Sequence, residues 1–478
     1  MVIVLAYDLG ASNGRLTAQH FDGHRLSMEE IHRFTNEVLP VGNHFYWDYA
    51  QIIKQLQDGI AKASNKEVAS LGIDTWGVDF GCLNASGQLI QNPYSYRDTH
   101  SELYVEQVKQ HYSHYTLYRR TGNEISSINT LFQLMAMTEH DADVLRQCTD
   151  ILMMPHLFMH ALSGEKMNEF TIASTSQLLN LETKQWDTEL ITDLISIPIS
   201  LAPIGQTHQI VGRLLQHPSI KMALVPGHDT ACALSALPIE QSNSIFISLG
   251  TWGLIGTELD NPVVSEEAFE QGFTNEGTSE KTIRFQKNAT GFWILQNIRK
   301  EWQQAHNAMT FEQETQAFEQ AQPFRSIIHP EDNRFFNPHS MMQEIAQFCV
   351  ATKQPVPTSI GAYIRCFNES VAIYYAKIIS NIETLTNHLS DTVYIGGGGT
   401  QNELLCQLIA NASGKRVVAG PVEASSIGNG LSQLRALGEI STIQDGRAIV
   451  KASFMLKEYE PQQTKLWNDM KKVFSHII

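Results

Sequence analysis

Several features are scarce in this chain of 478 residues, and each scarcity excludes a class of protein. The six cysteines are widely scattered and form no Cys-x-x-Cys pair, which argues against a disulfide-stapled scaffold and favours reduced thiols. Lys and Arg number 34 against 50 Asp and Glu, a net charge of −16, and no basic run interrupts this balance. We therefore expect no nucleic-acid partner, and a phosphorylated ligand would need a divalent cation and a local array of donors.

Long apolar runs are also missing. No stretch approaches the length of a membrane-spanning helix. The first apolar run, residues 2–7, stops at Asp8 and has no basic flank, which is typical of a strand and not of a signal peptide. These absences predict a cytoplasmic protein without a membrane partner, either a monomer or a small homo-oligomer. The length allows roughly two to four domains.

Two familiar phosphate-binding motifs are absent from the first strand–loop–strand segment, VIVLAYDLGASNGRLTAQHFDG at residues 2–23. No lysine follows the glycines, as the Walker-type phosphate loop requires. Gly10 and Gly14 are four positions apart, so the dinucleotide pattern G-x-G-x-x-G fails as well. A phosphate site here would therefore be of another kind.

The small-residue loop of this segment predicts a hairpin whose consecutive backbone N–H groups can bind an anion. The side chains of Ser12, Asn13 and Arg15 add donors around it. Asp8, at the end of the first strand, suits a Mg²⁺ ion held through its water shell. The alternative is a plain hairpin in which the aspartate makes a local turn hydrogen bond.

Strand-like runs alternate with helical periodicity throughout, which indicates an α/β architecture. Residues 244–259, SIFISLGTWGLIGTEL, repeat the strand–turn–strand design of the opening, with Thr251 in the loop. We interpret this as an internal duplication, although any two hairpins share some likeness. A domain boundary near Pro238–Asn243 would give two domains, residues 1–240 and 241–478.

Helices are expected at four places that frame the candidate motifs. One covers residues 50–63, and a long amphipathic helix runs through residues 371–385 with apolar residues at 4-3-4-3 spacing. A third starts near Asn402, after four consecutive glycines, and ends at Gly414. The last covers residues 463–474. The glycines, which lack Cβ atoms, would allow a flat ligand such as adenine to approach, unless they form only a flexible link.

The segment VPGHDTACAL, residues 225–234, predicts a strand followed by a helix that begins near Asp229. A helix N-terminus favours an ionised carboxylate, which can accept a proton from a substrate hydroxyl during phosphoryl transfer. His228 and Thr230 flank it as donors that could orient a polyol. The alternative is an ordinary Asp N-cap.

Residues 73–81, IDTWGVDFG, combine carboxylates, an indole and glycines after a strand, which suits a sugar pocket. Trp76 is equally typical of a simple core residue. The segments 275–277 and 287–296 carry polar residues that could face a binding cleft.

These segments together resemble the FGGY carbohydrate kinases. The stretches DLGASNGR, GIDTWGVDF, YRD, GHDTA, ISLGTWGL, TNEG, GGGGTQN and AGPVEAS follow in the order expected of that family, from Asp8 to about Gly430. The resemblance implies two actin-like domains of the ribonuclease-H type, with ATP and sugar in the cleft between them. It also implies Mg²⁺ as the accompanying ion.

The resemblance further implies roles for individual residues. The implied ATP contacts are Ala11, Ser12, Asn13, Gly14, Arg15, Thr251, Gln296 and Gly398. The implied sugar contacts are Gly77, His228, Asp229, Thr230 and Asn288. Asp229 matches the catalytic base, and Asp8 matches the carboxylate near Mg²⁺. Asn13 stands where a serine is expected and can still donate a hydrogen bond.

The stretches WGVDF, GHDT, SLGTW, TNEG and GPVEA favour, within the family, a kinase of L-rhamnulose over kinases of glycerol or xylulose. The implied reaction transfers phosphate from ATP to the 1-hydroxyl of L-rhamnulose, in L-rhamnose breakdown. One alternative keeps the chemistry and changes the sugar, to L-fuculose, xylulose or another ketose or polyol. Others are an actin- or Hsp70-like ATPase without a sugar, and a sugar-sensing regulator, for which no DNA-binding module is visible.

Overall fold

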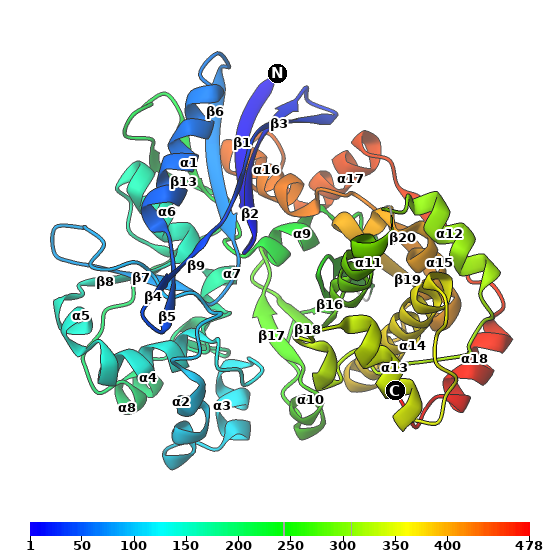
Figure 1. The fold of residues 1–478 in the computed structure, drawn as a ribbon. Coiled ribbons are helices and arrows are strands. Elements are labelled where there is room, and N and C mark those ends of the chain that lie inside the picture. Colours follow the sequence, from blue (N-terminus) through cyan, green and yellow to red (C-terminus); the bar gives the residue numbers. More distant parts are fainter. Residues whose placement is uncertain (242–243, 307) are drawn as a thin grey trace. The chain divides into compact units, whose positions relative to one another are not determined.

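The chain packs into two compact units, drawn as a ribbon in Figure 1. The computed structural model describes residues 1–241, 244–306 and 308–478. The first unit comprises Met1–Pro238, Glu258–Phe285 and Glu423–Phe454, and the second comprises Ile239–Thr257, Gln286–Val422 and Met455–Ile478. Two late segments thus pack with the first unit, where the sequence suggested two continuous domains. Of the boundary expected at Pro238–Asn243, residues 242 and 243 lie outside the described residues.

The first unit is built on a six-stranded sheet with the order β13-β14-β6-β1-β2-β3. β1 and β2 form an antiparallel hairpin, while β6 runs parallel to β1 and β14 runs parallel to β6. The last six residues of β1 are all buried, because the sheet is covered on both faces. The strands and helices of this unit are β1 Val2–Leu9, β2 Asn13–Phe21, β3 Leu26–Thr35, β4 Val38–Val41, β5 His44–Trp47, α1 Tyr49–Lys62, β6 Val68–Thr75, β7 Phe80–Leu83, α2 Glu102–Gln107, η1 Val108–Gln110, α3 His114–Thr121, α4 Thr130–His140, α5 Ala142–Gln147, β8 Asp150–Met153, α6 Met154–Ser163, β9 Asn168–Glu169, α7 Phe170–Ala173, β10 Leu179–Asn180, β11 Gln185–Trp186, α8 Thr188–Leu194, β12 Ile204–Gly205, β13 Gln209–Arg213, β14 Lys221–Leu224, α9 Asp229–Ala236, α10 Glu266–Glu270, β17 Thr274–Gly277, α16 Ala424–Leu437 and α17 Ile443–Ser453.

The second unit repeats this strand arrangement. Its strands follow the order β18-β16-β15-β19-β20-β21, so that β18-β16-β15-β19-β20 corresponds to β3-β2-β1-β6-β14. β15 forms an antiparallel hairpin with β16 and runs parallel to β19, which in turn runs parallel to β20. The elements are β15 Ile245–Leu249, β16 Trp252–Leu259, β18 Ile283–Thr290, α11 Trp293–Ala305, α12 Phe311–Gln320, η2 Asn333–Phe335, α13 Met341–Ala351, α14 Ile360–Thr386, β19 Thr392–Gly396, η3 Gly398–Gln401, α15 Glu403–Ser413, β20 Arg416–Ala419, β21 Lys457–Tyr459 and α18 Thr464–Val473.

The two hairpins that suggested a duplication have matching tips. In the first, Leu9 pairs with Gly14, and the N–H of Gly10 donates to the Asn13 carbonyl at 2.9 Å. In the second, Leu249 pairs with Gly253, and the N–H of Gly250 donates to the Trp252 carbonyl at 2.9 Å. Because the flanking strands also correspond, the predicted repeat is present as a repeat of topology. The α/β class and the division into two domains are confirmed.

The helices expected from the sequence are present with local signals that explain their ends. α1 is capped by Asp48, whose side chain accepts from the N–H of Gln51. α15 is capped by Asn402 and ends at Gly414, which adopts a left-handed conformation that favours glycine. α14 is the long amphipathic helix, and it starts eleven residues earlier than the stripe at 371–385 indicated. Capping residues therefore fix element boundaries more closely than periodicity does.

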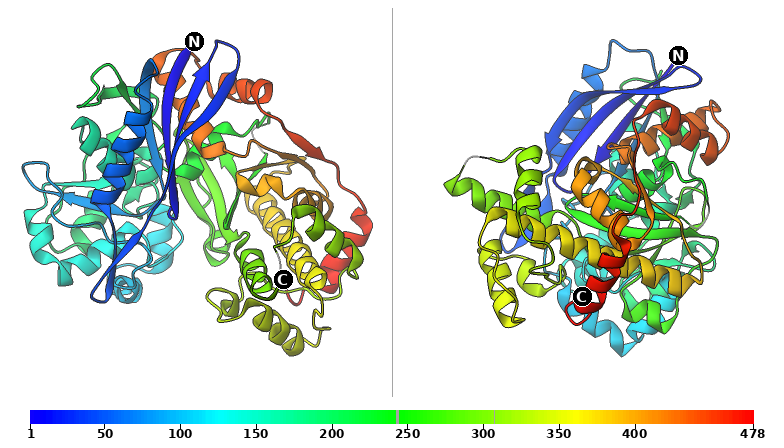
Figure 2. Two further views of the ribbon diagram at one scale, coloured as in Figure 1. Left: turned by 45° about the horizontal axis from the view of Figure 1, so that its top comes forward. Right: turned by 90° about the vertical axis from the view of Figure 1, so that its right-hand side faces the viewer.

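α16 returns from late in the sequence to lie on the sheet of the first unit, beside β1 and β6 (Figures 1 and 2). Its contact with the sheet is partly polar and fully buried. The amide of Asn429 donates to Asp74 Oδ2 at 2.6 Å and to the Tyr7 carbonyl at 3.3 Å. Gln433 donates to the Leu5 carbonyl at 2.8 Å and accepts from Ser70 Oγ at 2.7 Å. Buried polar contacts of this kind fix the register of the helix on the sheet.

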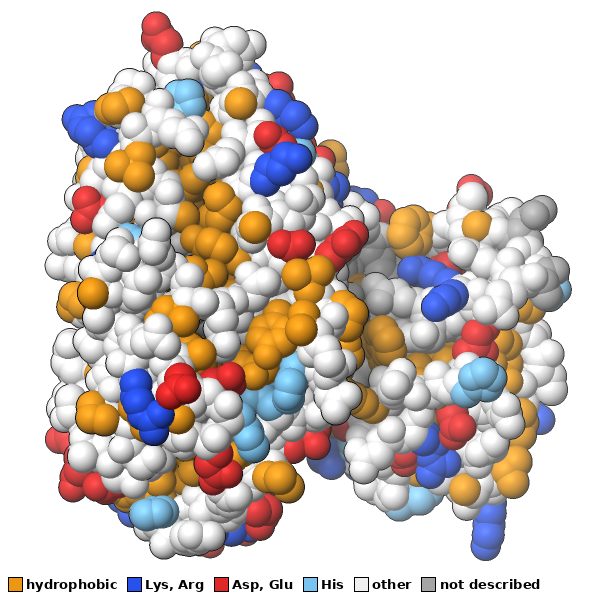
Figure 3. All heavy atoms as spheres, turned by 60° about the vertical axis from the view of Figure 1, so that its left-hand side comes forward, with side chains coloured by type: hydrophobic (Ala, Val, Ile, Leu, Met, Phe, Trp, Pro, Cys, Tyr) orange, Lys and Arg blue, Asp and Glu red, His pale blue; other side chains and the backbone are white. Residues whose placement is uncertain are grey.

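In the described parts of the chain, no helix is both long and apolar enough to cross a bilayer. On the face drawn in Figure 3, Lys and Arg side chains are dispersed among Asp and Glu.

Gly428, on α16, allows close packing against α9 in the first unit. A Cβ at this position would overlap the backbone carbonyl of Cys232, which cannot move without displacing α9. We expect Gly428→Ala to destabilise the protein by about 1–3 kcal/mol, since overpacking a tight contact forces backbone shifts. Thermal unfolding of the variant should show a midpoint several degrees lower.

Gly446→Ala on α17 is the matched control. A Cβ there would meet Leu431 at 3.4 Å or more, which is ordinary contact. Alanine in a helix interior should leave stability unchanged or raise it by up to about 1 kcal/mol. An unchanged midpoint for Gly428→Ala would contradict the tight contact between α16 and α9.

Candidate active site

The predicted site residues of the first unit gather at the carboxyl ends of its central strands. The N–H of Trp76, after β6, donates to the Leu9 carbonyl of β1 at 3.1 Å. The N–H of Thr75 donates to the Gly227 carbonyl at 2.9 Å, and Thr75 forms a parallel bridge with His228. Because parallel strands end at one edge of a sheet, this geometry brings the chain segments carrying three aspartates together, the usual place for a ligand in α/β sheets.

The three aspartates are Asp8, Asp74 and Asp229. Asp8 and Asp74 are register partners on adjacent parallel strands. Burial raises the pKa of Asp74 well above its ordinary value, and the charges of Asp8 and Asp229 raise it further against the opposing hydrogen bond from Asn429. From the sequence, Asp74 was expected only as one of the carboxylates of segment 73–81, which suits a sugar pocket.

Asp229 is the first residue of α9, and the N-cap residue is His228. The alternative of an ordinary Asp N-cap is therefore excluded. Burial raises the pKa of Asp229, and the nearby charge of Asp8 raises it as well, whereas His228 opposes the shift. A raised pKa makes a carboxylate a stronger proton acceptor, as long as it stays ionised at the working pH.

Two neighbours hold the Asp229 carboxylate in place. Its Oδ1 accepts from the Thr230 N–H at 2.6 Å and from the Thr230 hydroxyl at 3.1 Å. His228 Nε2 lies 3.3 Å from the same oxygen. The structure thus gives both flanking residues a function in orienting Asp229, and their contact with a sugar stays a prediction.

Glu276 and Arg284 complete the surroundings of His228. Glu276 Oε2 lies 3.2 Å from His228 Nδ1, and the Arg284 guanidinium contacts both side chains. The sequence pointed to the segment 275–277 but missed Arg284. An arginine between two apolar residues of a strand, Ile283 and Phe285, was the signal that could have found it.

Glu169 is a further functional residue that sequence reasoning missed. It is fully buried, and Oε2 accepts from the N–H groups of Thr171 and Gly227, both at 2.8 Å. Its other oxygen accepts from the Thr207 hydroxyl at 2.7 Å. Since Gly227 directly precedes His228, Glu169 fixes the backbone on which the candidate base stands.

The loop of the first hairpin has the form expected of an anion-binding loop. Ser12 and Asn13 are exposed at its tip. Asn36, directly after β3, braces the loop. Its N–H donates to the Ser12 carbonyl at 3.1 Å, and its side-chain amide donates to the Gly10 carbonyl at 2.5 Å. Gly14 is buried, and a Cβ there would overlap the Phe34 ring, so packing alone requires glycine at this position.

Arg15 has a different environment from the one expected of a phosphate ligand. Its Nη2 and Nε donate to Asp8 Oδ2 at 2.7 and 3.1 Å, and its Nη1 pairs with Glu423. Arg15 therefore shares its single positive charge between two acidic side chains. Its contact with ATP, like the contacts of Ala11 to Gly14, stays a prediction.

Asp8 fits the requirements of a Mg²⁺ ion. Both bonds from Arg15 fall on Oδ2, and no described residue donates to Oδ1. No group of three or more His, Cys, Asp or Glu side chains in the described chain could hold a metal by itself. Magnesium is commonly held by one or two carboxylates, waters and substrate phosphates, so a single aspartate with a free oxygen is suitable.

Gly77 lies in a strained turn after β6. A Cβ there would lie 3.2 Å from Thr175, tighter than most real contacts. The next residue, Val78, has a φ of 69°, which is unusual for a β-branched residue. Its backbone is held by the Thr175 hydroxyl, which accepts from the Val78 N–H at 3.0 Å, and by Thr130. Such strain is typical of binding sites.

Three of the predicted nucleotide contacts belong to the second unit. Gln296, on α11, donates to Thr251 Oγ1 at 3.4 Å. The Thr251 carbonyl accepts from the N–H of Trp293 at 3.2 Å, so the hairpin tip caps α11. Gly398, which follows β19, is exposed with open space above its Cα. Asn288 also belongs to the second unit, where it is exposed on β18.

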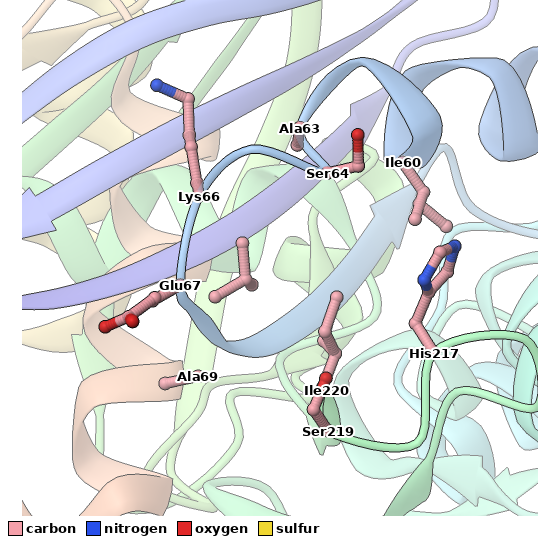
Figure 4. Close-up of a pocket in the computed structure, with 10 residues that line it drawn as sticks. Ile60, Ala63, Ser64, Lys66, Glu67, Ala69, His217, Ser219 and Ile220 are labelled. Carbon is pink, nitrogen blue, oxygen red and sulfur yellow. The ribbon is translucent and has the colours of Figure 1, made fainter.

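The pocket drawn in Figure 4 lies elsewhere in the first unit. It has a volume of about 360 Å³ and is lined by residues such as Ser64, Lys66 and His217. It adjoins Val68 at the amino end of β6, whereas the aspartates lie at the carboxyl end of the sheet. None of the predicted site residues lines it.

Comparison with known proteins decides the family. Residues 3–233 match the N-terminal domain of the FGGY family of carbohydrate kinases, and residues 245–437 match its C-terminal domain. The chain belongs to the FGGY family of carbohydrate kinases. Among curated relatives of this FGGY kinase is a rhamnulokinase from Bacteroides thetaiotaomicron, 37% identical over 97% of this chain and 96% of the relative. Another rhamnulokinase, from Bacillus subtilis, is 34% identical over 96% of both chains.

Solved structures of other FGGY kinases share the fold at low identity. A xylulose kinase from Lactobacillus acidophilus superposes with a TM-score of 0.82 at 15% identity, over 100% of this chain and 98% of that one. A glycerol kinase from Plasmodium falciparum, determined with ADP, gives 0.80 at 12% identity, over 100% and 98%. These likenesses establish the fold.

The contacts of Glu169 in this FGGY kinase generate a prediction. Glu169→Gln replaces an accepting oxygen with an NH₂ group that faces backbone N–H donors, which should destabilise the protein by about 1–3 kcal/mol. It should also lower the kinase rate, because Gly227 loses its anchor. Denaturation and steady-state kinetics measure the two effects. Glu165→Gln, for which no side-chain hydrogen bond is present in the described chain, should leave both unchanged.

Proposed function

We propose that the protein is an ATP-dependent rhamnulokinase, which phosphorylates the 1-hydroxyl of L-rhamnulose to give L-rhamnulose 1-phosphate and ADP. The choice of L-rhamnulose as the sugar rests on the identity of 34–37% with rhamnulokinases over nearly the whole chain. The geometry of Asp229 supports the chemistry, since a carboxylate with a raised pKa stands at a strand edge among donors that orient it. The reaction belongs to L-rhamnose breakdown.

The proposal divides the predicted contacts between the two substrates. The sugar contacts are Gly77, His228, Asp229, Thr230 and Asn288. The ATP contacts are Ala11, Ser12, Asn13, Gly14, Arg15, Thr251, Gln296 and Gly398. Two observations support this division. The strain at Val78, beside Gly77, is typical of binding sites. The loop at Ser12 is exposed to a ligand, and so are Thr251, Gln296 and Gly398.

Asp229 acts as the general base in this proposal. Its carboxylate accepts the proton of the 1-hydroxyl as that oxygen attacks the γ-phosphorus in line. The bond from the γ-phosphorus to the bridging oxygen breaks, and ADP leaves with the electron pair. Thr230 and His228 keep Oδ1 oriented, so little of the carboxylate's freedom remains to be lost when the sugar binds.

Mg²⁺, when bound, neutralises charge on the transferring phosphates, and Asp8 would hold it through water. Arg15 holds the Asp8 carboxylate in place by its two hydrogen bonds. Because ATP is a cytoplasmic metabolite, the proposed reaction assigns the enzyme to the cytoplasm.

A panel of sugars tests the substrate. With ATP and Mg²⁺, ADP release should be fastest with L-rhamnulose, and at least tenfold slower with L-fuculose, D-xylulose and glycerol. The measurement is a coupled assay of ADP formation at equal sugar concentrations, which compares kcat/KM. Faster turnover of another ketose would identify that ketose as the substrate instead of L-rhamnulose. ATP hydrolysis at the same rate without sugar would instead support the Hsp70-like ATPase.

Asp229→Asn tests the catalytic base. The variant should lose about 10²–10⁴-fold in kcat, because an amide cannot accept the proton, while ADP binding by calorimetry stays near that of the wild type. Asp143→Asn is the control, since Asp143 forms a surface pair with Arg146 and should not affect the rate. Near-normal turnover by Asp229→Asn would show that Asp229 is not the catalytic base.

A further inference from the structure

Arg97 lies beside the phosphate loop of the first unit and was given no role above. It belongs to the YRD stretch, between β7 and α2, and its side chain is exposed. Its Nη2 donates to the Ala11 carbonyl at 3.2 Å and to Ser12 Oγ at 3.4 Å. A guanidinium thus touches the two loop residues at which ATP phosphates are expected.

The charge of Arg97 has no acidic partner among the residues that the structure describes. No described residue supplies a carboxylate that pairs with it, in contrast to Arg15, which is bound by Asp8 and Glu423. The adjacent Asp98 is occupied elsewhere: its oxygens accept from the Phe45 N–H at 2.6 Å and contact two histidine rings. Arg97 is therefore a cation with donors to spare in a protein of net charge −16.

Aromatic side chains hold the Arg97 guanidinium in place. Its carbon lies 5.9 Å from the centre of the Trp47 ring and 5.7 Å from that of Tyr96. Trp47 is itself rigid, because it is fully buried and its Nε1 donates to Asp79 Oδ2 at 2.7 Å. The same oxygen accepts from the Tyr96 N–H at 3.1 Å. Stacking on such a platform limits the rotamers that a free arginine would sample.

Phosphoryl transfer needs positive charge at this position. The loop lacks the lysine of a Walker motif, and Arg15 is engaged with two acids. Arg15 supplies one positive charge for the two carboxylates of Asp8 and Glu423, so an approaching triphosphate still meets negative charge beside the loop. An arginine that contacts the transferring group is a known means of stabilising the charge that spreads over its equatorial oxygens.

We propose that Arg97 is a further catalytic residue, whose unused N–H donors bind oxygens of the γ-phosphoryl group as it moves to the sugar. The proposal rests on the proposed function, since it takes the loop at Ala11 and Ser12 as the phosphate site. Arg97 takes no part in proton transfer, which the proposed function assigns to Asp229. Its effect is to lower the barrier of the transfer step and not to hold the nucleotide.

Two variants of Arg97 test the proposal. Arg97→Met keeps an apolar stem over Trp47 and removes the charge, so kcat should fall at least 100-fold, while the Kd for ADP changes less than threefold. Arg97→Lys keeps the charge without the planar fork and should lose about tenfold in kcat. Arg146→Met is the control, because Arg146 is an exposed arginine of the same unit that pairs with Asp143. Its kcat should equal that of the wild type.

A structural role for Arg97, in which it only holds the loop, predicts a different pattern. ADP binding would weaken, the thermal midpoint would fall, and kcat at saturating ATP would remain near normal. Two further measurements separate the roles. Guanidinium salt should raise the kcat of Arg97→Ala at least tenfold. Aluminium fluoride with ADP, Mg²⁺ and sugar should form a tight complex with the wild type but not with Arg97→Met.

The proposal is overturned by a kcat within threefold of the wild type in Arg97→Met, or by the structural pattern. If Arg97→Met does not fold, Arg97→Lys decides, and a wild-type rate in it overturns the proposal. These outcomes are distinct from failure of the proposed function. If the wild type does not phosphorylate L-rhamnulose, the comparison of variants is made on the sugar that the panel identifies.

Discussion

The buried hydrogen bonds between α16 and the central strands of the first unit are the contact on which the candidate site depends. Asn429 binds Asp74 Oδ2 and the Tyr7 carbonyl, and so ties the helix to both β6 and β1, one residue from Asp8. The other side of α16 packs on α9 through Gly428, and α9 begins with Asp229. One helix thus sets the positions of the chain segments that carry all three aspartates.

Placing the three aspartates together costs free energy, and the proposed function explains why the protein bears that cost. Burial and mutual repulsion raise the pKa of Asp74 and Asp229, which means that the ionised forms are disfavoured where they stand. The protein offsets part of this with Arg15, which neutralises Asp8, and with the donors of Asn429 and Thr230. In the proposed mechanism, a bound cation and a proton from the substrate supply the remaining positive charge.

The local features of this protein could be predicted from the sequence, whereas the contacts between distant segments could not. The first hairpin, the start of a helix at Asp229 and the cap at Asn402 depend on neighbouring residues, and the structure has all three. Glu169, Arg284 and the partner of Arg15 at Glu423 were missed, because each acts on residues far away in the chain. The return of residues 423–454 to the first unit is of the same kind, since nothing in a helical period tells which sheet the helix will cover.

That return also constrains how the protein is made. Val4 and Phe21, on the first two strands, share a core cluster with Ile427 and Leu434 of α16. During translation the first two strands leave the ribosome about 400 residues before α16 does, a delay of roughly 20 to 80 s at typical elongation rates. During that time the nascent first unit exposes an apolar face and the unpaired Asp74, so its first strands remain uncovered until α16 packs on them. A polypeptide whose last helices close its first sheet completes its folding only after nearly all of it has emerged.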